Sequence, residues 1–212
     1  SNRVFESVTG PVDGSPSATV KVLSQTTTAY DEVNRPYRSD TLDFDTVTGN
    51  DLNGGHRVRE TRYDPAGRVT DLQDGNTNHT QIAYDTAGRK SVVTDALLNT
   101  VTTGYDDNSN VVTITRVEKS ADALSADTTY VTTLAHDGIN RVVKTVSNAS
   151  DVNEAFYDSR SNVVKTSDAV RGAAQPTGPG NVVLTDFDAM DRLVRTERKI
   201  TSNGRGDGAS SG

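Results

Sequence analysis

The chain of 212 residues contains no Cys and no Trp, and only 5% of its residues are aromatic. The absence of Cys excludes a disulfide framework, Cys-ligated zinc and thiol catalysis, although it does not decide the cellular compartment. Hydrophobic residues make up only 33% of the chain, which is thin for a domain with one dense centre. Such a composition suits an elongated repeat in which each unit buries a modest face. We find no signal peptide at the start and no apolar run long enough to span a bilayer.

Positive charge is also scarce, because 22 Lys and Arg residues face 29 Asp and Glu residues, giving a net charge of −7. The two signs are interspersed rather than gathered into runs. Binding to a nucleic-acid backbone needs a basic face that neutralises phosphates, and no such face is visible. We therefore expect no nucleic-acid partner and interpret the acidity as a contribution to solubility.

One short pattern recurs through most of the chain: an aromatic residue, then Asp, a small turn segment, Arg or Asn, and an aliphatic-rich strand. The clearest copies are Tyr63-Asp64-Pro65-Ala66-Gly67-Arg68 and Tyr84-Asp85-Thr86-Ala87-Gly88-Arg89. Copies begin at Tyr30, Tyr63, Tyr84, Tyr105, His136, Tyr157 and Phe187, and Phe44-Asp45 is a further, doubtful one. Three of the six intervals between the seven aromatic residues are 21 residues, and the others are 30, 31 and 33. This spacing indicates one structural unit with insertions of about ten residues.

Each position of the pattern has a chemical reason in a strand, turn, strand unit. The Asp carboxylate can accept backbone N–H groups two residues on and so close a turn, while Gly67 and Gly88 allow a positive φ. Asn140 and Asp191 tolerate that conformation at the equivalent place; Ser109 and Ser161 fit less well, so we expect the turn to vary there. The β-branched runs that follow, such as residues 142–146 and 163–166, favour strands. Each period is thus expected to be a β-hairpin.

The Tyr-Asp-x-x-Gly-Arg motif at a period near 21 resembles the YD repeat of the rearrangement-hotspot (RHS) family, and the resemblance covers residues 30–196. That family includes bacterial RHS proteins, insecticidal toxin-complex subunits and teneurins. The resemblance implies a long sheet that spirals into a hollow shell, which encloses a toxic C-terminal polypeptide in bacterial relatives and takes part in adhesion in teneurins. The structural repeat residues are Tyr30, Asp31, Tyr63, Asp64, Gly67, Arg68, Tyr84, Asp85, Gly88, Arg89, Tyr105, Asp106, His136, Asp137, Arg141, Tyr157, Asp158, Phe187, Asp188 and Arg192.

The chain departs from that family in two respects. Closed shells need many more than seven repeats, and the self-cleaving segment with an aspartyl protease pair does not follow the last repeat. We therefore expect a piece of a longer protein or a short, open relative of the shell.

These observations predict an all-β fold, a YD-repeat β-hairpin array forming one continuous twisted or spiralling antiparallel sheet of roughly twelve to sixteen strands. Residues 1–29 would be an N-terminal strand region or the start of the array, 30–200 the array itself, and 201–212 a flexible Gly/Ser-rich tail. The integrin-type tripeptide Arg205-Gly206-Asp207 lies in that tail, where such residues occur together easily. The insertion at residues 118–127 is expected to form a helical turn, and the loop at 172–180 to project from the wall.

A catalytic triad would need one of the His residues as its base: His56, His79 or His136. His136 occupies the aromatic position of a repeat, so we expect it to serve packing. His56 and His79 fall in polar, turn-like stretches without a ligand-spaced partner. We therefore predict no catalytic residue and no enzyme.

Two pairs of carboxylates, Asp43 with Asp45 and Asp186 with Asp188, could share a strand face and bind Ca²⁺ if further oxygens came near. Neither pair lies in a loop of alternating acidic ligands, so we interpret them as a solvated face. No metal ligand and no cofactor is predicted.

The preferred function is a scaffold segment of a secreted or cell-surface bacterial protein, a shell wall around a cargo or toxin polypeptide. One alternative is an adhesion module that binds carbohydrate or a surface protein, which exposed Tyr rings would favour and buried ones would weaken. Another is a subunit of an extracellular fibre that assembles through open strand edges. The expected partners are other parts of a longer YD-repeat chain or copies of itself, with no membrane span.

Overall fold

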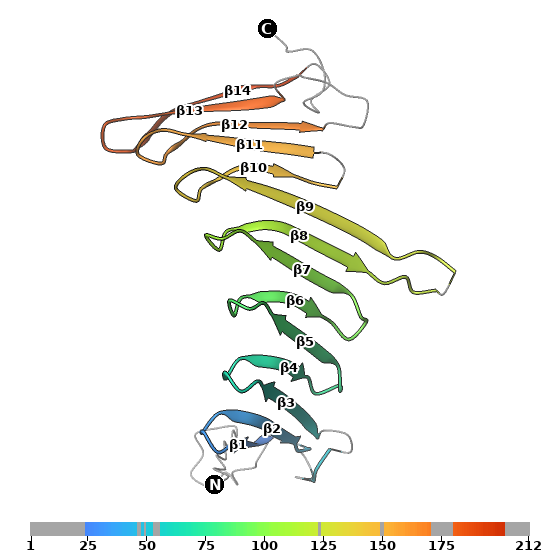
Figure 1. The fold of residues 1–212 in the computed structure, drawn as a ribbon. Helices are drawn as coiled ribbons and strands as arrows, with labels where there is room; N and C mark the ends of the chain where they lie inside the picture. The colour runs from blue at the N-terminus through green and yellow to red at the C-terminus, as the bar shows by residue number, and fades with distance from the viewer. Residues whose placement is uncertain are drawn as a thin grey trace. The chain divides into compact units, whose positions relative to one another are not determined.

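The computed structural model describes residues 24–45, 48, 50–52, 56–122, 124–148, 151–170 and 180–201 (Figure 1). The predicted all-β fold of antiparallel strands is confirmed, with fourteen strands and no helix in these ranges. The strands are β1 Ser24–Tyr30, β2 Pro36–Asp43, β3 Arg57–Tyr63, β4 Val69–Gln73, β5 His79–Tyr84, β6 Lys90–Thr94, β7 Thr100–Tyr105, β8 Val111–Glu118, β9 Thr128–His136, β10 Val142–Val146, β11 Asp151–Tyr157, β12 Val163–Val170, β13 Asn181–Phe187 and β14 Leu193–Lys199.

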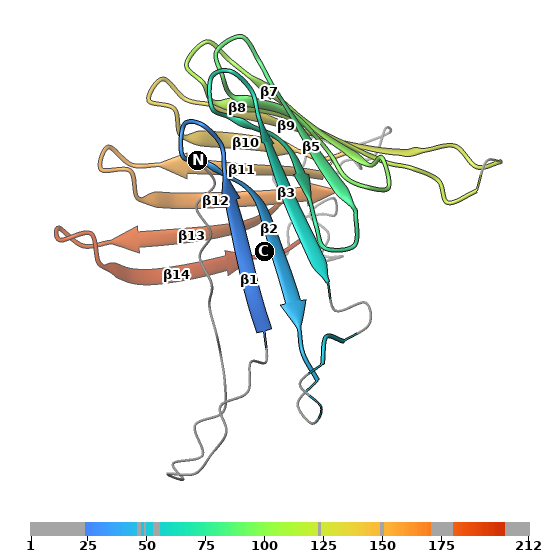
Figure 2. The same ribbon diagram turned by 90° about the horizontal axis from the view of Figure 1, so that it is seen from below.

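The chain divides into two compact units, Ser1–Asn99 with β1 to β6 and Thr100–Gly212 with β7 to β14. Within each unit the strands follow one another in chain order, and every strand is antiparallel to its neighbours (Figures 1 and 2). The turns that follow the aromatic residues lie along the same edge of the sheet in each unit (Figure 1). Short connections between consecutive antiparallel strands explain this order, because each hairpin needs only a tight turn.

The aromatic residue of each repeat is the last residue of its strand and sits at a β-bulge. Tyr63 lies opposite Val69, while Arg62 lies opposite Asp71, so that Thr70 is the extra residue of the facing strand. The same shift occurs at the other aromatic positions, namely Tyr30, Tyr84, Tyr105, His136, Tyr157 and Phe187. A bulge bends the strand and redirects its side chains. The aromatic residue and the following Asp therefore have the same position relative to the turn in every repeat.

The apolar core is thin. Among the described residues, only Ile82 and Val152 are buried hydrophobic residues, and Asp71, Ser167 and Thr201 are buried polar ones. Most strand residues are instead half-buried. Cohesion must therefore depend strongly on backbone ladders and on contacts between neighbouring turns, because a small buried apolar area gives little hydrophobic stabilisation.

The expectation of a helical turn at residues 118–127 is wrong, because these residues form the tip of the β8–β9 hairpin (Figure 1). Asp122 closes this tip by accepting the N–H groups of Leu124 and Ser125, at 2.9 and 2.6 Å. Lys119 pairs with Asp127 at 2.7 Å across its base. A short polar segment with an Asp in its middle satisfies its backbone donors by a side-chain turn without forming a helix.

Several sequence-based expectations lie outside the described residues. They concern most of residues 1–29, nearly all of the loop at 172–180, and the tail from residue 202 with its Arg-Gly-Asp tripeptide.

Candidate functional site

A five-residue turn that begins with Asp closes each aromatic-containing hairpin. In the turn from Asp64 to Arg68, the backbone N–H of Arg68 donates to Asp64 Oδ1 at 2.9 Å, and its Nε donates to Oδ2 at 2.7 Å. The N–H of Gly67 donates to the Asp64 carbonyl at 2.9 Å. One carboxylate thus holds both the backbone and the side chain of the fifth residue. The turns that begin at Asp31, Asp85, Asp106, Asp137, Asp158 and Asp188 have the same backbone bonds.

The fourth residue of every such turn has a positive φ. Gly67 and Gly88 both have φ of 82°, where a side chain would be strained. Ser109 and Ser161 adopt 69° and 71°, so the expectation that the turn varies at these two Ser residues is wrong. The remaining fourth residues are Asn34, Asn140 and Asp191. The carboxylate bonds of the turn hold the backbone in this conformation whether or not the residue is Gly.

The same turn also closes hairpins that lack an aromatic residue. Asp74 accepts the backbone N–H and the side-chain amide of Asn78, at 2.9 and 3.0 Å. Asp95 does the same for Asn99. The sequence pattern indicated a turn here but not that it repeats the first kind. The spacing of Asp and Asn four residues apart is the signal that could have revealed it.

These hydrogen bonds hold the pKa values of the turn carboxyls below their usual range. The backbone N–H of the fifth residue is the main cause for Asp31, Asp64, Asp85 and Asp137. The side-chain amides of Asn110 and Asn162 are the main causes of the lowered pKa values of Asp106 and Asp158, and the guanidinium of Arg192 is the main cause of the lowered pKa of Asp188. The turns are therefore built around ionised carboxylates.

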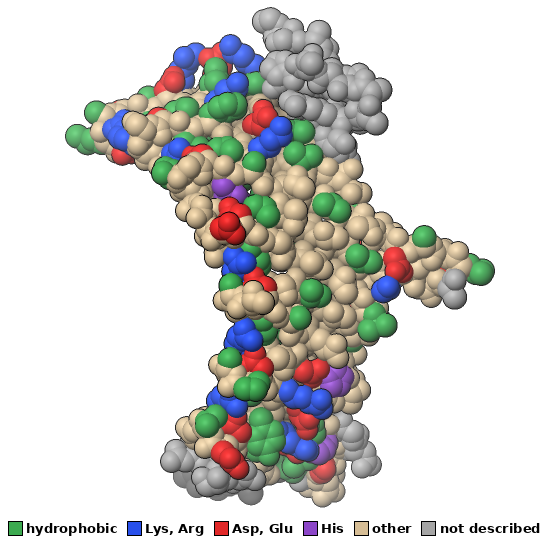
Figure 3. All heavy atoms as spheres, in the orientation of Figure 1, with side chains coloured by type: hydrophobic (Ala, Val, Ile, Leu, Met, Phe, Trp, Pro, Cys, Tyr) green, Lys and Arg blue, Asp and Glu red, His purple; other side chains and the backbone are tan. Residues whose placement is uncertain are grey.

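The Arg at the fifth position also contacts the next repeat. Its guanidinium lies over the ring of the following Tyr, with Arg68 4.5 Å from the ring centroid of Tyr84. Arg35 over Tyr63 and Arg141 over Tyr157 repeat this contact at 4.4 and 4.3 Å. A guanidinium over an aromatic ring is an attractive cation–π contact. Figure 3 shows basic and acidic side chains alternating along the turn edge of the first unit.

The Tyr whose ring lies under the Arg is also held by a hydrogen bond of its hydroxyl. Tyr84 donates its hydroxyl to the carbonyl of Val69 at 2.8 Å. Tyr63 and Tyr157 bond in the same way to the carbonyls of Pro36 and Val142, at 2.8 and 2.9 Å. Each accepting residue belongs to the first strand after the preceding repeat's turn. The Tyr ring therefore joins two successive repeats through both its face and its hydroxyl.

The guanidinium finally reaches the fourth residue of the next turn. A Cβ atom on Gly88 would lie 3.2 Å from Arg68 Nη1, and one on Gly67 would lie 3.3 Å from Arg35 Nη1. Arg141 Nη1 instead donates to Ser161 Oγ at 3.0 Å. The space beside the Arg admits a small residue, either Gly or a Ser that accepts a hydrogen bond.

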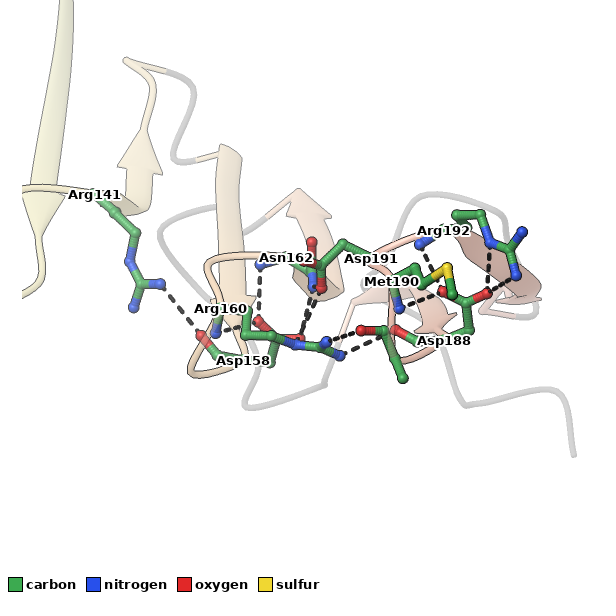
Figure 4. A network of polar contacts seen from close by, with 9 residues as sticks. Arg141, Asp158, Arg160, Asn162, Asp188, Met190, Asp191 and Arg192 are labelled. Carbon is green, nitrogen blue, oxygen red and sulfur yellow. Dashed lines mark hydrogen bonds and ion pairs between the residues drawn. The ribbon is translucent and has the colours of Figure 1, made fainter.

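Two repeats carry Asn in place of Arg, and their link to the next turn is different. Asn162 Nδ2 donates to its own Asp158 at 3.0 Å and to Asp191 Oδ1 of the next turn at 2.8 Å (Figure 4). Asn110 likewise donates to Asp106 at 3.0 Å and to Asn140 Oδ1 at 2.8 Å. The shorter amide cannot reach over a ring, so the partner side chain comes from the fourth residue of the next turn.

Arg160 reinforces the second of these links from the third position of its turn. Its guanidinium donates to the carbonyl of Ala189 at 2.8 Å and to that of Asp188 at 3.1 Å, and it lies 3.0 Å from Asp191 Oδ1 (Figure 4). The next turn is thus bound through its backbone as well as through a side chain.

His136 stands at the aromatic position of its repeat, opposite Val142. Its Nδ1 is buried without a hydrogen-bond partner. The two other His residues pair with carboxylates: His79 Nδ1 lies 2.9 Å from Asp71 Oδ1, and His56 pairs with Asp40. His79 is the first residue of β5 and does not lie in a turn, contrary to expectation.

The carboxylate pairs considered for Ca²⁺ have other partners. Asp43 pairs with Arg57 at 2.7 Å, and Asp45 accepts the N–H of Thr48. Asp186 pairs with Arg195 at 3.5 Å, and Asp188 with Arg192 at 2.7 Å. Within the described part of the chain, no group of three or more His, Asp or Glu side chains could hold a metal ion.

A broad hollow of about 420 Å³ lies on the second unit's sheet, over strands β10 to β14. Val143, Ala155 and Val182 line it, and Lys144 and Glu154 form an ion pair of 3.5 Å at its side. The hollow is open and mixed in polarity, so its shape alone selects no ligand. In the described ranges, no helix is long and apolar enough to cross a membrane.

No protein family and no curated protein sequence matches the chain. Among solved structures, the chain is similar to a chain in the crystal structure of TcdB2-TccC3-TEV, with 15% identity and a TM-score of 0.45 over 88% of this chain and 12% of that one. For TcdB2-TccC3-Cdc42 the identity is 10% and the TM-score 0.45, over 89% and 13% of the two chains. For TcdB2-TccC3 the values are 13% and 0.39, over 90% and 12%. This chain thus spans about an eighth of the length of the chains it resembles.

Proposed function

We propose that the chain is a non-enzymatic wall segment of a longer, secreted or surface-exposed bacterial YD-repeat protein, in which the array encloses a cargo or toxin polypeptide. The observation that carries the proposal is that the polar side chains of the repeats bond mainly to other groups of the repeats. The Asp and the fifth residue of the aromatic-containing turns, together with several Tyr residues, are engaged in closing a turn or in joining one repeat to the next. A repeat array that is held together mainly by bonds between its repeats is suited to form a wall around another polypeptide.

The arrangement of the Tyr rings supports the scaffold over a sugar-binding surface. Tyr63, Tyr84 and Tyr157 are half-buried, with an Arg over one face and the hydroxyl bonded to a carbonyl. Stacking on a sugar needs an open aromatic face. Contacts within the repeat array therefore take up one face and the hydroxyl of each of these Tyr rings.

An adhesion module is the second candidate, because aromatic rings other than those of the repeat Tyr residues are exposed, and among the described residues those of Phe156 and Tyr130 are the most exposed. Phe156 is 45% exposed and Tyr130 is 44% exposed. Lys165 lies 4.6 Å from the centroid of the Phe156 ring. Either ring could offer a surface for a carbohydrate or a surface protein.

Two measurements on the purified chain test these candidates. Under limited proteolysis, the scaffold predicts that the turns closed by a carboxylate, such as those from Asp64 to Arg68 and from Asp85 to Arg89, resist cleavage. In a screen against immobilised glycans and labelled cells, it predicts no saturable binding. Saturable binding that is lost in Phe156→Ala or Tyr130→Ala, but kept in Leu124→Ala at the fully exposed hairpin tip, would overturn the scaffold in favour of adhesion.

A further inference from the structure

The five links between successive aromatic-containing turns within the two units fall into two chemical kinds. Where the fifth residue is Arg, the next aromatic is Tyr and the next fourth residue is small. Where the fifth residue is Asn, the next aromatic is not Tyr and the next fourth residue carries an amide or carboxylate. The first kind comprises Arg35 with Tyr63 and Gly67, Arg68 with Tyr84 and Gly88, and Arg141 with Tyr157 and Ser161. The second comprises Asn110 with His136 and Asn140, and Asn162 with Phe187 and Asp191.

The geometry explains why the three positions go together. Arg reaches its own Asp and still extends over the next ring, where its Nη1 leaves no room for a large fourth residue. Asn is too short to lie over the ring and needs an oxygen brought to it by the next turn, as Asp191 does at 2.8 Å. If an Arg were followed by a turn with a large fourth residue, its guanidinium would be crowded. If an Asn were followed by a turn with Gly at that place, its amide would lack an acceptor. Both situations are destabilising.

The most C-terminal of the described turns presents an Arg whose outer side is exposed. The Arg192 side chain pairs with Asp188 at 2.7 Å but is 73% exposed. The corresponding Arg35, Arg68 and Arg141 are 33%, 38% and 25% exposed. In the sequence that follows Arg192 there is no aromatic residue.

Strand β14, which begins directly after Arg192, also has exposed side chains. The side chains of Leu193 and Val194 at the start of β14 are 57% and 61% exposed. Among the described strands, β14 pairs only with β13. Exposed apolar side chains next to a strand edge are the features that an added strand covers.

We propose that Arg192, Leu193 and Val194 form a docking edge for a β-hairpin of the same repeat type, and that Arg192 selects a hairpin with Tyr at the aromatic position and Gly or Ser at the fourth turn position. The added strand covers Leu193 and Val194, and its Tyr ring lies under the Arg192 guanidinium. A second copy of the chain would present its first turn, in which Tyr30 is combined with Asn34. That turn has the Tyr but not the small fourth residue, so a second copy fits this edge less well than a hairpin with Tyr and Gly.

The proposal rests on the scaffold function and is tested with a hairpin from the chain itself. The probe is a fluorescent peptide of residues 57–73, which contains Tyr63 and Gly67, and the matched control is the same peptide with Tyr63→Phe and Gly67→Asn. Binding to the whole chain is followed by fluorescence anisotropy. We expect the unchanged peptide to bind about tenfold more tightly than its control, because the control lacks the Tyr hydroxyl that bonds to a carbonyl of the preceding repeat and carries a fourth residue that crowds the guanidinium.

The variant Arg192→Asn provides the internal control, because Asn at the fifth position can bond to the Asp of its own turn, as Asn162 does with Asp158. We expect it to reverse the preference, so that the Phe and Asn peptide binds more tightly. Equal binding of the two peptides, no binding of either, or an unchanged preference in Arg192→Asn would overturn the proposal. Self-association of the chain that depends on Arg192 and is not inhibited by the peptide would instead assign the edge to a second copy. None of these outcomes affects the proteolysis and glycan results, so failure here is distinguishable from failure of the scaffold function.

Discussion

Replacing Tyr84 with Ala is expected to lower the free energy of unfolding by about 3 kcal/mol, the low end for the loss of a large aromatic side chain because the ring is only half-buried. The variant loses the ring under Arg68 and the hydrogen bond to the carbonyl of Val69. The effect is large because the thin apolar core has little else to bridge these repeats. Urea unfolding followed by circular dichroism measures it.

Tyr84→Phe is the matched control for this variant. It keeps the ring under the guanidinium and removes only the hydroxyl, so we expect a loss of about 1 kcal/mol. Equal unfolding midpoints for Tyr84→Ala and the parent chain would show that the ring does not join the repeats.

Acid is expected to unfold the chain as the pH falls below about 4, the usual pKa of an Asp carboxyl. The bonded turn carboxyls have pKa values lower in the folded state than in the unfolded chain. The unfolded state therefore takes up protons first as the pH falls, and stability decreases. Above about pH 5, where the carboxyls are ionised in both states, the stabilisation is fully present. The contributing turn residues are Asp31, Asp64, Asp74, Asp85, Asp95, Asp106, Asp137, Asp158 and Asp188.

Urea midpoints measured between pH 7 and about pH 2.5 test this expectation. We expect a plateau down to about pH 5 and a steep decrease below about pH 4. The variant Asp64→Asn, which cannot ionise, should be less stable at pH 7 and should show a weaker dependence on pH. Stability that stays constant or rises from pH 5 to pH 3 would contradict turns built on ionised carboxylates.

The fold was predictable from the sequence because its signal is local and repeated. An aromatic-Asp pair that recurs every 21 to 33 residues, as from Tyr63 to Tyr84, marks the end of a strand and the start of a turn. The all-β class and the antiparallel hairpins therefore agree with the structure. The two Ser positions were misjudged because intrinsic φ preference was considered without the carboxylate bonds that override it at Ser109 and Ser161.

The links between repeats were less accessible from the sequence, because they join residues 16 to 30 positions apart. Nothing local to Arg68 indicates that its guanidinium lies over Tyr84, since its bond to Asp64 accounts for its presence in the motif. The exchange of Arg for Asn at Asn110 and Asn162 resembled drift of the repeat. The structure shows that each Asn has its own acceptor in the next turn.

The central claim is that each turn is energetically coupled to the next repeat through its fifth residue. A double-mutant cycle on the whole chain, with Arg68→Met and Tyr84→Leu, tests it most directly by measuring the coupling energy from urea unfolding. We predict a coupling of about 1 kcal/mol for this pair. The control cycle, which combines Arg35→Met with Tyr84→Leu, should give a coupling near zero because Arg35 lies over Tyr63 instead. Coupling near zero for Arg68 and Tyr84 as well would contradict the account.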